Sequence, residues 1–171
     1  METKASASES KATLDQFQGK YLTFMLAEEE YGLEIMKVRE IIGLMDITKL
    51  PRTPKFVKGV INLRGKVIPV VDLRLKFGLP ETEYTDKTCI IVVEIAFQGG
   101  THQMGIIVDE VSEVMNVTSD ELEPTPKFGV ALDTEFILAM AKMKDSVRTL
   151  LDINKVLSGD EIAAMSNAAK V

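Results

Sequence analysis

Apolar and polar residues alternate along this chain in short runs that turn-forming residues interrupt. Such alternation is typical of β-strands, because successive side chains of a strand point to opposite faces. It predicts strands over residues 21–26, 31–35, 57–63, 67–71, 89–96, 103–108, 136–143 and 147–153. Gly, Lys, Asp and Ser between the runs predict turns at residues 64–66, 98–100 and 144–146. We therefore expect an all-β protein.

Helical patterns are few. Residues 35–42 are ambiguous, because Ile35, Val38 and Ile42 have helical spacing while β-branched residues favour strands. Ser158 with Glu161 three residues later forms a capping-box pattern, which predicts a short C-terminal helix.

The two ends of the chain lack the pattern of a packed element. Residues 1–16 are rich in Ser, Ala and Glu, and we expect them to form a flexible N-terminal tail. We expect residues 161–171 to form a C-terminal tail. The segment between the tails, residues 17–160, is then the folded domain.

The chain contains an internal repeat. Residues 32–41 match residues 105–114 without a gap, and residues 56–77 match residues 136–157. Gly, Glu and Asp recur at equivalent positions and in the same order. A true duplication explains these matches better than the general likeness of alternating strands.

The repeat leads to a prediction of architecture. Each unit has only about 60 residues, a length at which a separate core is marginal. Two small antiparallel barrels packed together would share a core and leave few exposed edges. We expect two pseudo-repeated lobes over approximately residues 17–80 and 86–158, with a groove between them as the natural docking place.

Charge and composition narrow the class of protein. The 171 residues include 20 basic and 26 acidic ones, which give a net charge of −6. Nucleic-acid binding depends on basic side chains that neutralise phosphates, and small barrels that bind single strands also use stacking aromatics. Aromatic residues make up 6% of the chain and tryptophan is absent. A nucleic-acid-binding barrel is therefore only an unfavoured alternative.

One local stretch is basic in spite of the overall charge. It contains Lys49, Arg52, Lys55 and Lys58, with Pro51 and Pro54 interleaved. A charge run interrupted by prolines is typical of a solvated loop. We expect such a loop here.

No apolar run reaches the roughly 18 residues that a membrane span needs. The first residues also lack the apolar core of a secretory signal. We expect a cytoplasmic protein without direct membrane insertion.

Candidate catalytic and metal-binding groups are sparse. The sequence has no phosphate-binding loop, no dinucleotide fingerprint and no zinc-binding pair of histidines. Cys89 and His102 are the single cysteine and histidine, and neither has the further partners that a nucleophile or a metal site needs. Asp72 and Asp152 occupy equivalent repeat positions, which favours a capping role over acid–base work. We predict no catalytic activity, no cofactor and no metal.

The methionines allow two interpretations. Met36, Met45, Met104 and Met115 lie near the repeated segments. Methionine side chains supply adaptable contact surface in some proteins and fill cores in others. The sequence favours core filling but leaves both open.

Ordered motifs give the chain a family resemblance. Residues 59–65 read Gly-Val-Ile-Asn-Leu-Arg-Gly, and residues 69–74 read Pro-Val-Val-Asp-Leu-Arg. Together with residues 31–41, 105–111 and 150–153, they resemble the motifs of CheW-type chemotaxis coupling proteins. The resemblance covers roughly residues 18–158.

The resemblance implies a fold and a role. Proteins of this type form two five-stranded, SH3-like β-barrels with a hydrophobic junction. They bind the regulatory domain of a CheA-type histidine kinase and the cytoplasmic tip of chemoreceptors, and they are recruited to membrane-associated receptor arrays. The same module occurs in CheV-type proteins, so an interaction module of that kind without its receiver domain is the alternative. A stand-alone adaptor is the expectation for this chain.

The resemblance also implies partner-binding residues. By motif position these are Val38, Glu40, Arg64, Val111 and Val114. Core packing is the alternative for the three valines, because valine is often buried. For Glu40 and Arg64 the hypothesis is an ion pair that orients the hairpin, since the repeat places Glu113 and Lys144 at the matching positions. A surface pair of no consequence is the alternative.

Overall fold

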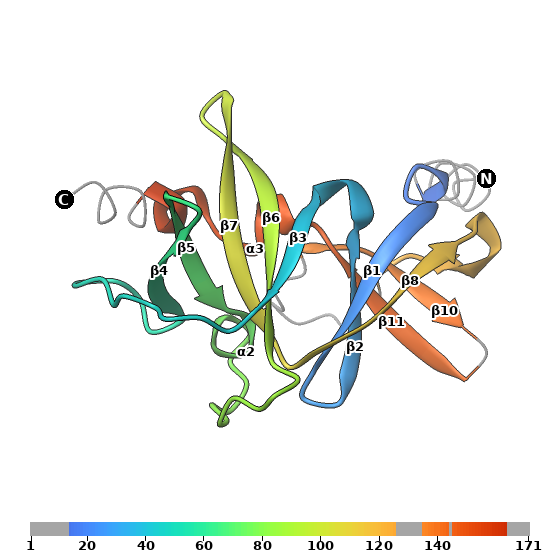
Figure 1. The fold of residues 1–171 in the computed structure, drawn as a ribbon. Helices are drawn as coiled ribbons and strands as arrows, with labels where there is room; N and C mark the ends of the chain where they lie inside the picture. The colour runs from blue at the N-terminus through green and yellow to red at the C-terminus, as the bar shows by residue number, and fades with distance from the viewer. Residues whose placement is uncertain (1–13, 126–134, 144, 164–171) are drawn as a thin grey trace.

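Two curled β-sheets pack against each other in this protein (Figure 1). The structure is a computed structural model, and it describes residues 14–125, 135–143 and 145–163. The first sheet has the strand order β3-β6-β7-β5-β4. Its strands are β3 (Val38–Gly43), β4 (Val57–Leu63), β5 (Lys66–Asp72), β6 (Cys89–Phe97) and β7 (Gly100–Val108).

The second sheet has the order β8-β1-β2-β11-β10-β9. Its strands are β1 (Gly19–Leu26), β2 (Glu29–Glu34), β8 (Glu110–Val117), β9 (Leu122–Glu123), β10 (Ile137–Met143) and β11 (Ser146–Leu151). The predicted all-β class is confirmed.

Each sheet closes on itself to form a barrel. In the first sheet, Thr48 follows β3 and exchanges two backbone hydrogen bonds with Val60 of β4, each of 2.8 Å. In the second sheet, β8 continues through the 3₁₀ turn η2 (Ser119–Glu121) into β9, which pairs with β10. Because β8 and β9 act as one bent strand, each lobe agrees with the expected five-stranded, SH3-like barrel.

The predicted division into consecutive lobes, residues 17–80 and 86–158, is wrong. Strands β1 and β2 of the first repeat pair with β8 and β11 of the second. Strands β6 and β7 of the second repeat pair with β3 and β5 of the first. Each repeat thus gives its first hairpin to the barrel of the other. A sequence repeat identifies equivalent strands, but it does not predict whether they pair within one copy or between copies. Either pairing satisfies the same backbone hydrogen-bonding groups.

The duplication itself is evident in the pairing. Strand β2 runs parallel to β11 with Gly32 opposite Leu150, and β7 runs parallel to β5 with Gly105 opposite Val70. A Cβ atom at Gly32 would lie 2.9 Å from a methyl group of Leu150, and one at Gly105 would lie 3.3 Å from a methyl group of Val70. The repeated glycines therefore allow the same close approach of strands in both barrels.

Strand residues alternate between two buried surfaces. Ile90 and Val92 of β6 point into the first barrel, whereas Ile91, Val93 and Ile95 point toward the other barrel. A strand buried on both faces reads as a continuous apolar run. This explains why residues 89–93 show no polar alternation in the sequence.

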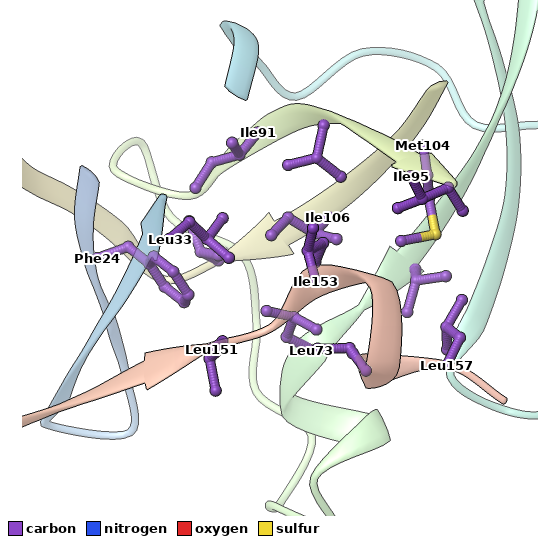
Figure 2. Packing of buried hydrophobic residues seen from close by; sticks show 14 of the residues in the cluster. Phe24, Leu33, Leu73, Ile91, Ile95, Met104, Ile106, Leu151, Ile153 and Leu157 are labelled. Carbon is purple, nitrogen blue, oxygen red and sulfur yellow. The ribbon is translucent and has the colours of Figure 1, made fainter. Parts of the chain in front are cut away.

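The junction between the barrels is itself a core. Phe24, Leu33 and Leu151 from the second sheet meet Ile91 and Ile106 from the first, as Figure 2 shows. Among the described residues, these side chains fill the centre of the junction, so the predicted groove is not present there. Two hollows lie at its rim.

Short helical segments follow two of the strands. Asp72 caps α2 (Leu73–Lys76), where its Oδ1 accepts the N–H groups of Arg74 at 2.9 Å and Leu75 at 3.4 Å. Asp152 caps α3 (Ile153–Val156) by accepting the N–H of Asn154 at 3.1 Å. The predicted capping role of both aspartates is confirmed.

The C-terminal capping box is also present. Ser158 donates its N–H to Glu161 Oε1 at 2.8 Å, and Glu161 donates its N–H to Ser158 Oγ at 3.1 Å. Helix follows over residues 159–163. Most of both predicted tails, residues 1–13 and 164–171, lies outside the described residues.

Candidate partner-binding surface

The β4–β5 hairpin presents Arg64 at its turn. Arg64 and Gly65 both have positive φ angles, 52° and 85°, as a two-residue type I′ turn requires. Asn62 Oδ1 accepts the N–H of Gly65 at 2.8 Å and so braces the turn. The turn predicted at residues 64–66 is confirmed, and it leaves 71% of the Arg64 side chain exposed.

Glu40 pairs with Arg64 across the end of the first barrel. Arg64 Nη1 donates to Glu40 Oε2 at 3.3 Å, and Nη2 donates to Oε1. The hydrogen bond and the charge of Glu40 raise the pKa of the Arg64 guanidinium. The hypothesis that the two residues pair is confirmed. Because solvent screens so exposed a pair, its contribution to stability is small.

The three valines divide between core and surface. Val38 of β3 and Val111 of β8 are partly buried and pack against the junction core. They occupy equivalent positions of the repeat, and both contribute to core packing. Val114 of β8 is 53% exposed and belongs to the surface. The five predicted residues therefore form no single cluster.

Sequence reasoning missed a set of exposed apolar side chains. Ile41 is 45% exposed and is the repeat equivalent of Val114. Val67 is 57% exposed and matches Val147, which is 49% exposed. Each barrel therefore displays an equivalent pair of exposed apolar side chains. The repeat alignment matches these residues with one another, but the alternation of apolar and polar residues does not predict that their side chains are exposed.

Two of the four methionines considered above are exposed, and the other two fill cores. Met36, in the 3₁₀ turn η1 (Ile35–Lys37), is 87% exposed, and Met45 is 37% exposed. Met104 is fully buried in the junction core, and Met115 is buried in the second barrel. Met36 thus adds adaptable apolar surface just before β3.

A polar clamp fixes the two barrels at the rim of the junction. Arg74 of α2 donates from Nη1 to Asp109 Oδ2 at 2.5 Å. The same oxygen accepts the N–H of Ala27 at 2.8 Å, in the β1–β2 turn. Asp109 also donates its own N–H to the carbonyl of Met25 at 3.1 Å. The clamp joins α2 of one barrel to the first hairpin of the other.

Two hollows open at this rim. One of about 320 Å³ lies beside the clamp and is lined by Arg74, Lys87, Glu83 and Glu110 among others. The other, of about 360 Å³, lies between α2 and α3, where Phe77 and Phe136 stack with ring centroids 5.0 Å apart. Both carry groups of either charge on their walls.

The single histidine and the single cysteine are the side chains with catalytic potential. His102 is exposed on β7 and meets the ring of Phe97 edge-on at 6.1 Å. Burial raises the pKa of the Cys89 thiol, which keeps it protonated. In the part of the chain that the structure describes, no three His, Cys, Asp or Glu side chains gather as metal ligands.

Within those same ranges, no helix has the length and hydrophobicity that crossing a bilayer requires.

Comparisons with known proteins agree on one family. The sequence model of the CheW-like domain matches residues 20–161. The chain is 39% identical over 164 residues to the chemotaxis protein CheW of Klebsiella aerogenes, with 96% of each chain covered. It is 38% identical over 139 residues to the chemotaxis protein CheW of Bacillus subtilis, covering 81% of this chain and 86% of that protein.

A solved structure also matches the fold. It is the crystal structure of the scaffolding protein TtCheW from Thermoanaerobacter tengcongensis, which has a TM-score of 0.74 and 39% sequence identity. The match covers 85% of this chain and 97% of that chain.

Proposed function

This chain belongs to the family of CheW-like domain proteins, and on that premise we propose that it is a non-catalytic adaptor of chemotaxis signalling. It couples chemoreceptors to a CheA-type histidine kinase by binding both. The observation that carries the proposal is the exposed β4–β5 hairpin, whose Arg64 is held by Glu40 in a chain of this family. An oriented, exposed arginine amid apolar side chains is a typical interface anchor.

The proposed binding residues are Val38, Glu40, Arg64, Val111 and Val114. Glu40 and Arg64 contribute a fixed polar contact, and Val114 contributes an apolar one. Val38 and Val111 act from beneath, because they pack on the junction core and set the positions of β3 and β8. Ile41, on the same strand as Glu40, and Met36, just before that strand, add exposed apolar side chains to the first barrel.

The proposed mechanism is geometric. The adaptor lies in the cytoplasm and is recruited to membrane-associated receptor arrays, where it places the kinase beside the receptor tip. A shift of the receptor then changes the relative free energies of the kinase's active and inactive states. Neither partner is altered chemically by the adaptor.

The test is a binding measurement by calorimetry with a CheA-type kinase regulatory domain from the same organism. We expect micromolar or tighter binding by the wild type and at least about tenfold weaker binding by Arg64→Ala. Arg39→Ala is the matched control, because Arg39 lies on the same strand as Glu40 and pairs instead with Glu94. Absence of binding by the folded wild type would contradict the proposal.

A charge-reversal cycle tests the role of the pair itself. Glu40→Arg and Arg64→Glu each place two like charges together, so each single variant should bind the kinase domain more weakly. The double variant restores opposite charges and should recover most of the lost affinity. If the double variant binds no better than either single variant, the pair does not orient the hairpin for binding.

A further inference from the structure

A basic loop projects from the first barrel between β3 and β4. It contains Lys49, Arg52 and Lys55, and Lys58 follows at the start of β4. Four cations within ten residues contrast with the net charge of −6 on the whole chain. The loop therefore creates a local field of the opposite sign to that of the molecule.

The base of the loop is fixed to the barrel. Thr48 and Val60 exchange two backbone hydrogen bonds of 2.8 Å on either side of it. Gly59 has a φ of 141°, and a Cβ atom there would lie 2.0 Å from the carbonyl oxygen of Thr48. Only glycine permits this close crossing of backbones, so the two ends of the loop are held together.

Two turns shape the loop above its base. Pro51 and Arg52 form the first turn, across which Thr53 Oγ1 donates to the carbonyl of Leu50 at 3.1 Å. In the second turn, Val57 donates its N–H to the carbonyl of Pro54 at 3.0 Å. Because proline fixes its own φ angle, both turns lose little freedom when a partner binds. The cations are presented on a prearranged backbone.

Three of these cations have no anionic partner among the residues that the structure describes. Lys49, Arg52 and Lys55 are exposed, and across the described residues no carboxylate lies within ion-pair distance of them. Lys58 differs, because its Nζ lies 3.2 Å from Glu81 Oε1. The three free charges are thus available to another molecule.

The backbone at Arg52 gives a second, independent indication. Its φ of 58° is a conformation that favours glycine or asparagine over residues with long side chains. Arg64 has a similar φ of 52°, and its guanidinium is used to contact Glu40. Arg52 has a similar backbone conformation, and no side chain in the described ranges pairs with its guanidinium, which is consistent with a contact outside the chain.

We propose that Lys49, Arg52 and Lys55 form a docking site for an acidic segment of a partner protein. A short acidic peptide needs only a local match of charge, which the fixed loop supplies. A nucleic acid would bring many more phosphates against a chain of net charge −6, and the nearby Phe56 is covered by Lys76, whose Nζ lies 4.7 Å from the ring centroid. The inference does not depend on the kinase-coupling role.

The test uses fluorescence anisotropy with the full chain and a fluorescein-labelled, glutamate-rich peptide of about ten residues. Wild type should bind, and binding should weaken as salt is raised through about 0.3 M, since exposed charges are screened. The variant Lys49→Glu, Arg52→Glu, Lys55→Glu should bind at least about tenfold more weakly.

A matched control separates location from total charge. The variant Lys20→Glu, Lys142→Glu, Lys155→Glu reverses three exposed cations elsewhere and changes the net charge by the same amount. It should keep the peptide affinity within about twofold. Equal losses in the two variants, or no peptide binding by the wild type, would overturn the proposal.

Two further readouts decide between occupants. A single-stranded oligonucleotide of equal charge, or phosphatidylserine vesicles, that bound the loop in preference to the peptide would contradict a protein partner. Analytical sedimentation tests whether the occupant is a second copy of this chain. Self-association of the wild type that is lost in the loop variant would also contradict a protein partner of another kind. We expect a monomer whose loop prefers the peptide.

Discussion

The carboxylate of Asp72 is buried and accepts three hydrogen bonds, from the N–H groups of Arg74 and Leu75 and from the hydroxyl of Tyr84 at 2.8 Å. Asp152, its repeat equivalent, accepts one from Asn154. We predict that Asp72→Ala lowers the free energy of unfolding by about 2–4 kcal/mol and Asp152→Ala by about 1 kcal/mol. Urea unfolding measures both. Equal losses would show that the Tyr84 contact contributes nothing.

Glu161 makes stability depend on pH. Burial raises its pKa, but hydrogen bonds from Lys76 and Ser158 outweigh burial and leave the pKa below its ordinary value of 4.5. A lowered pKa in the folded state means that the charged form stabilises the fold above the ordinary value, and that this contribution disappears as pH falls through the lowered value.

The comparison of wild type with Glu161→Gln measures this contribution. We predict that the variant is less stable than the wild type at about pH 7 and that the difference shrinks toward about pH 3. Urea unfolding at both pH values gives the two differences. If the stability difference between wild type and variant stayed constant over this pH range, the charge of Glu161 would not contribute to the stability of the fold.

At the scale of elements, sequence alternation identified most strands but not all. It predicted the runs that became β4, β5, β6 and β10, because their faces are clearly apolar. It missed β8, since only Met115 and Val117 of that strand are buried and its pattern is therefore weak. Residues 35–42, which were ambiguous, form η1 followed by β3.

The candidate site was predictable only in part. Motif resemblance and the repeat together suggested the Glu40–Arg64 pair, which the structure contains. The exposure of Ile41 was not predictable, because a register shift between Val38 and Glu40 decides which face of β3 points outward. Such a bulge depends on pairing with β6, which the local sequence does not encode.

Gly59 and Gly65 allow a prediction about the loop anchor. Both have positive φ angles, but a Cβ at Gly59 would collide with the Thr48 backbone, whereas Gly65 has open space around it. We predict that Gly59→Ala costs more than about 3 kcal/mol of stability and Gly65→Ala about 1 kcal/mol. Thermal or urea unfolding of both variants checks this. A milder effect at Gly59 would mean that the Thr48–Val60 bridge gives way easily.

At the scale of the whole molecule, the shared junction core predicts a single unfolding transition. Residues from both barrels fill this core, so neither barrel keeps its packing when the other opens. Circular dichroism at increasing urea should coincide with an independent signal from the tyrosines. Two separate transitions would show that the barrels are independent.

The exchanged hairpins predict complementation between fragments. A chain divided at about residue 82, before β6, separates β1–β5 from β6–β11, and each barrel then draws strands from both pieces. We predict that neither fragment folds alone and that the two form a one-to-one complex when co-expressed. Co-purification and circular dichroism test this. Independent folding of one fragment would contradict it.

The crossed pairing also has an evolutionary consequence. A single repeat lacks the strands that would complete either barrel, so two copies of one repeat would form complete barrels only as a homodimer that exchanges hairpins. Gene duplication and fusion would join such a dimer into one chain and allow the two halves to differ. One half could then acquire a basic loop while its counterpart, residues 118–135, took on acidic residues instead. Fusion of the two copies into one chain permits a difference between the halves that a homodimer of identical chains lacks.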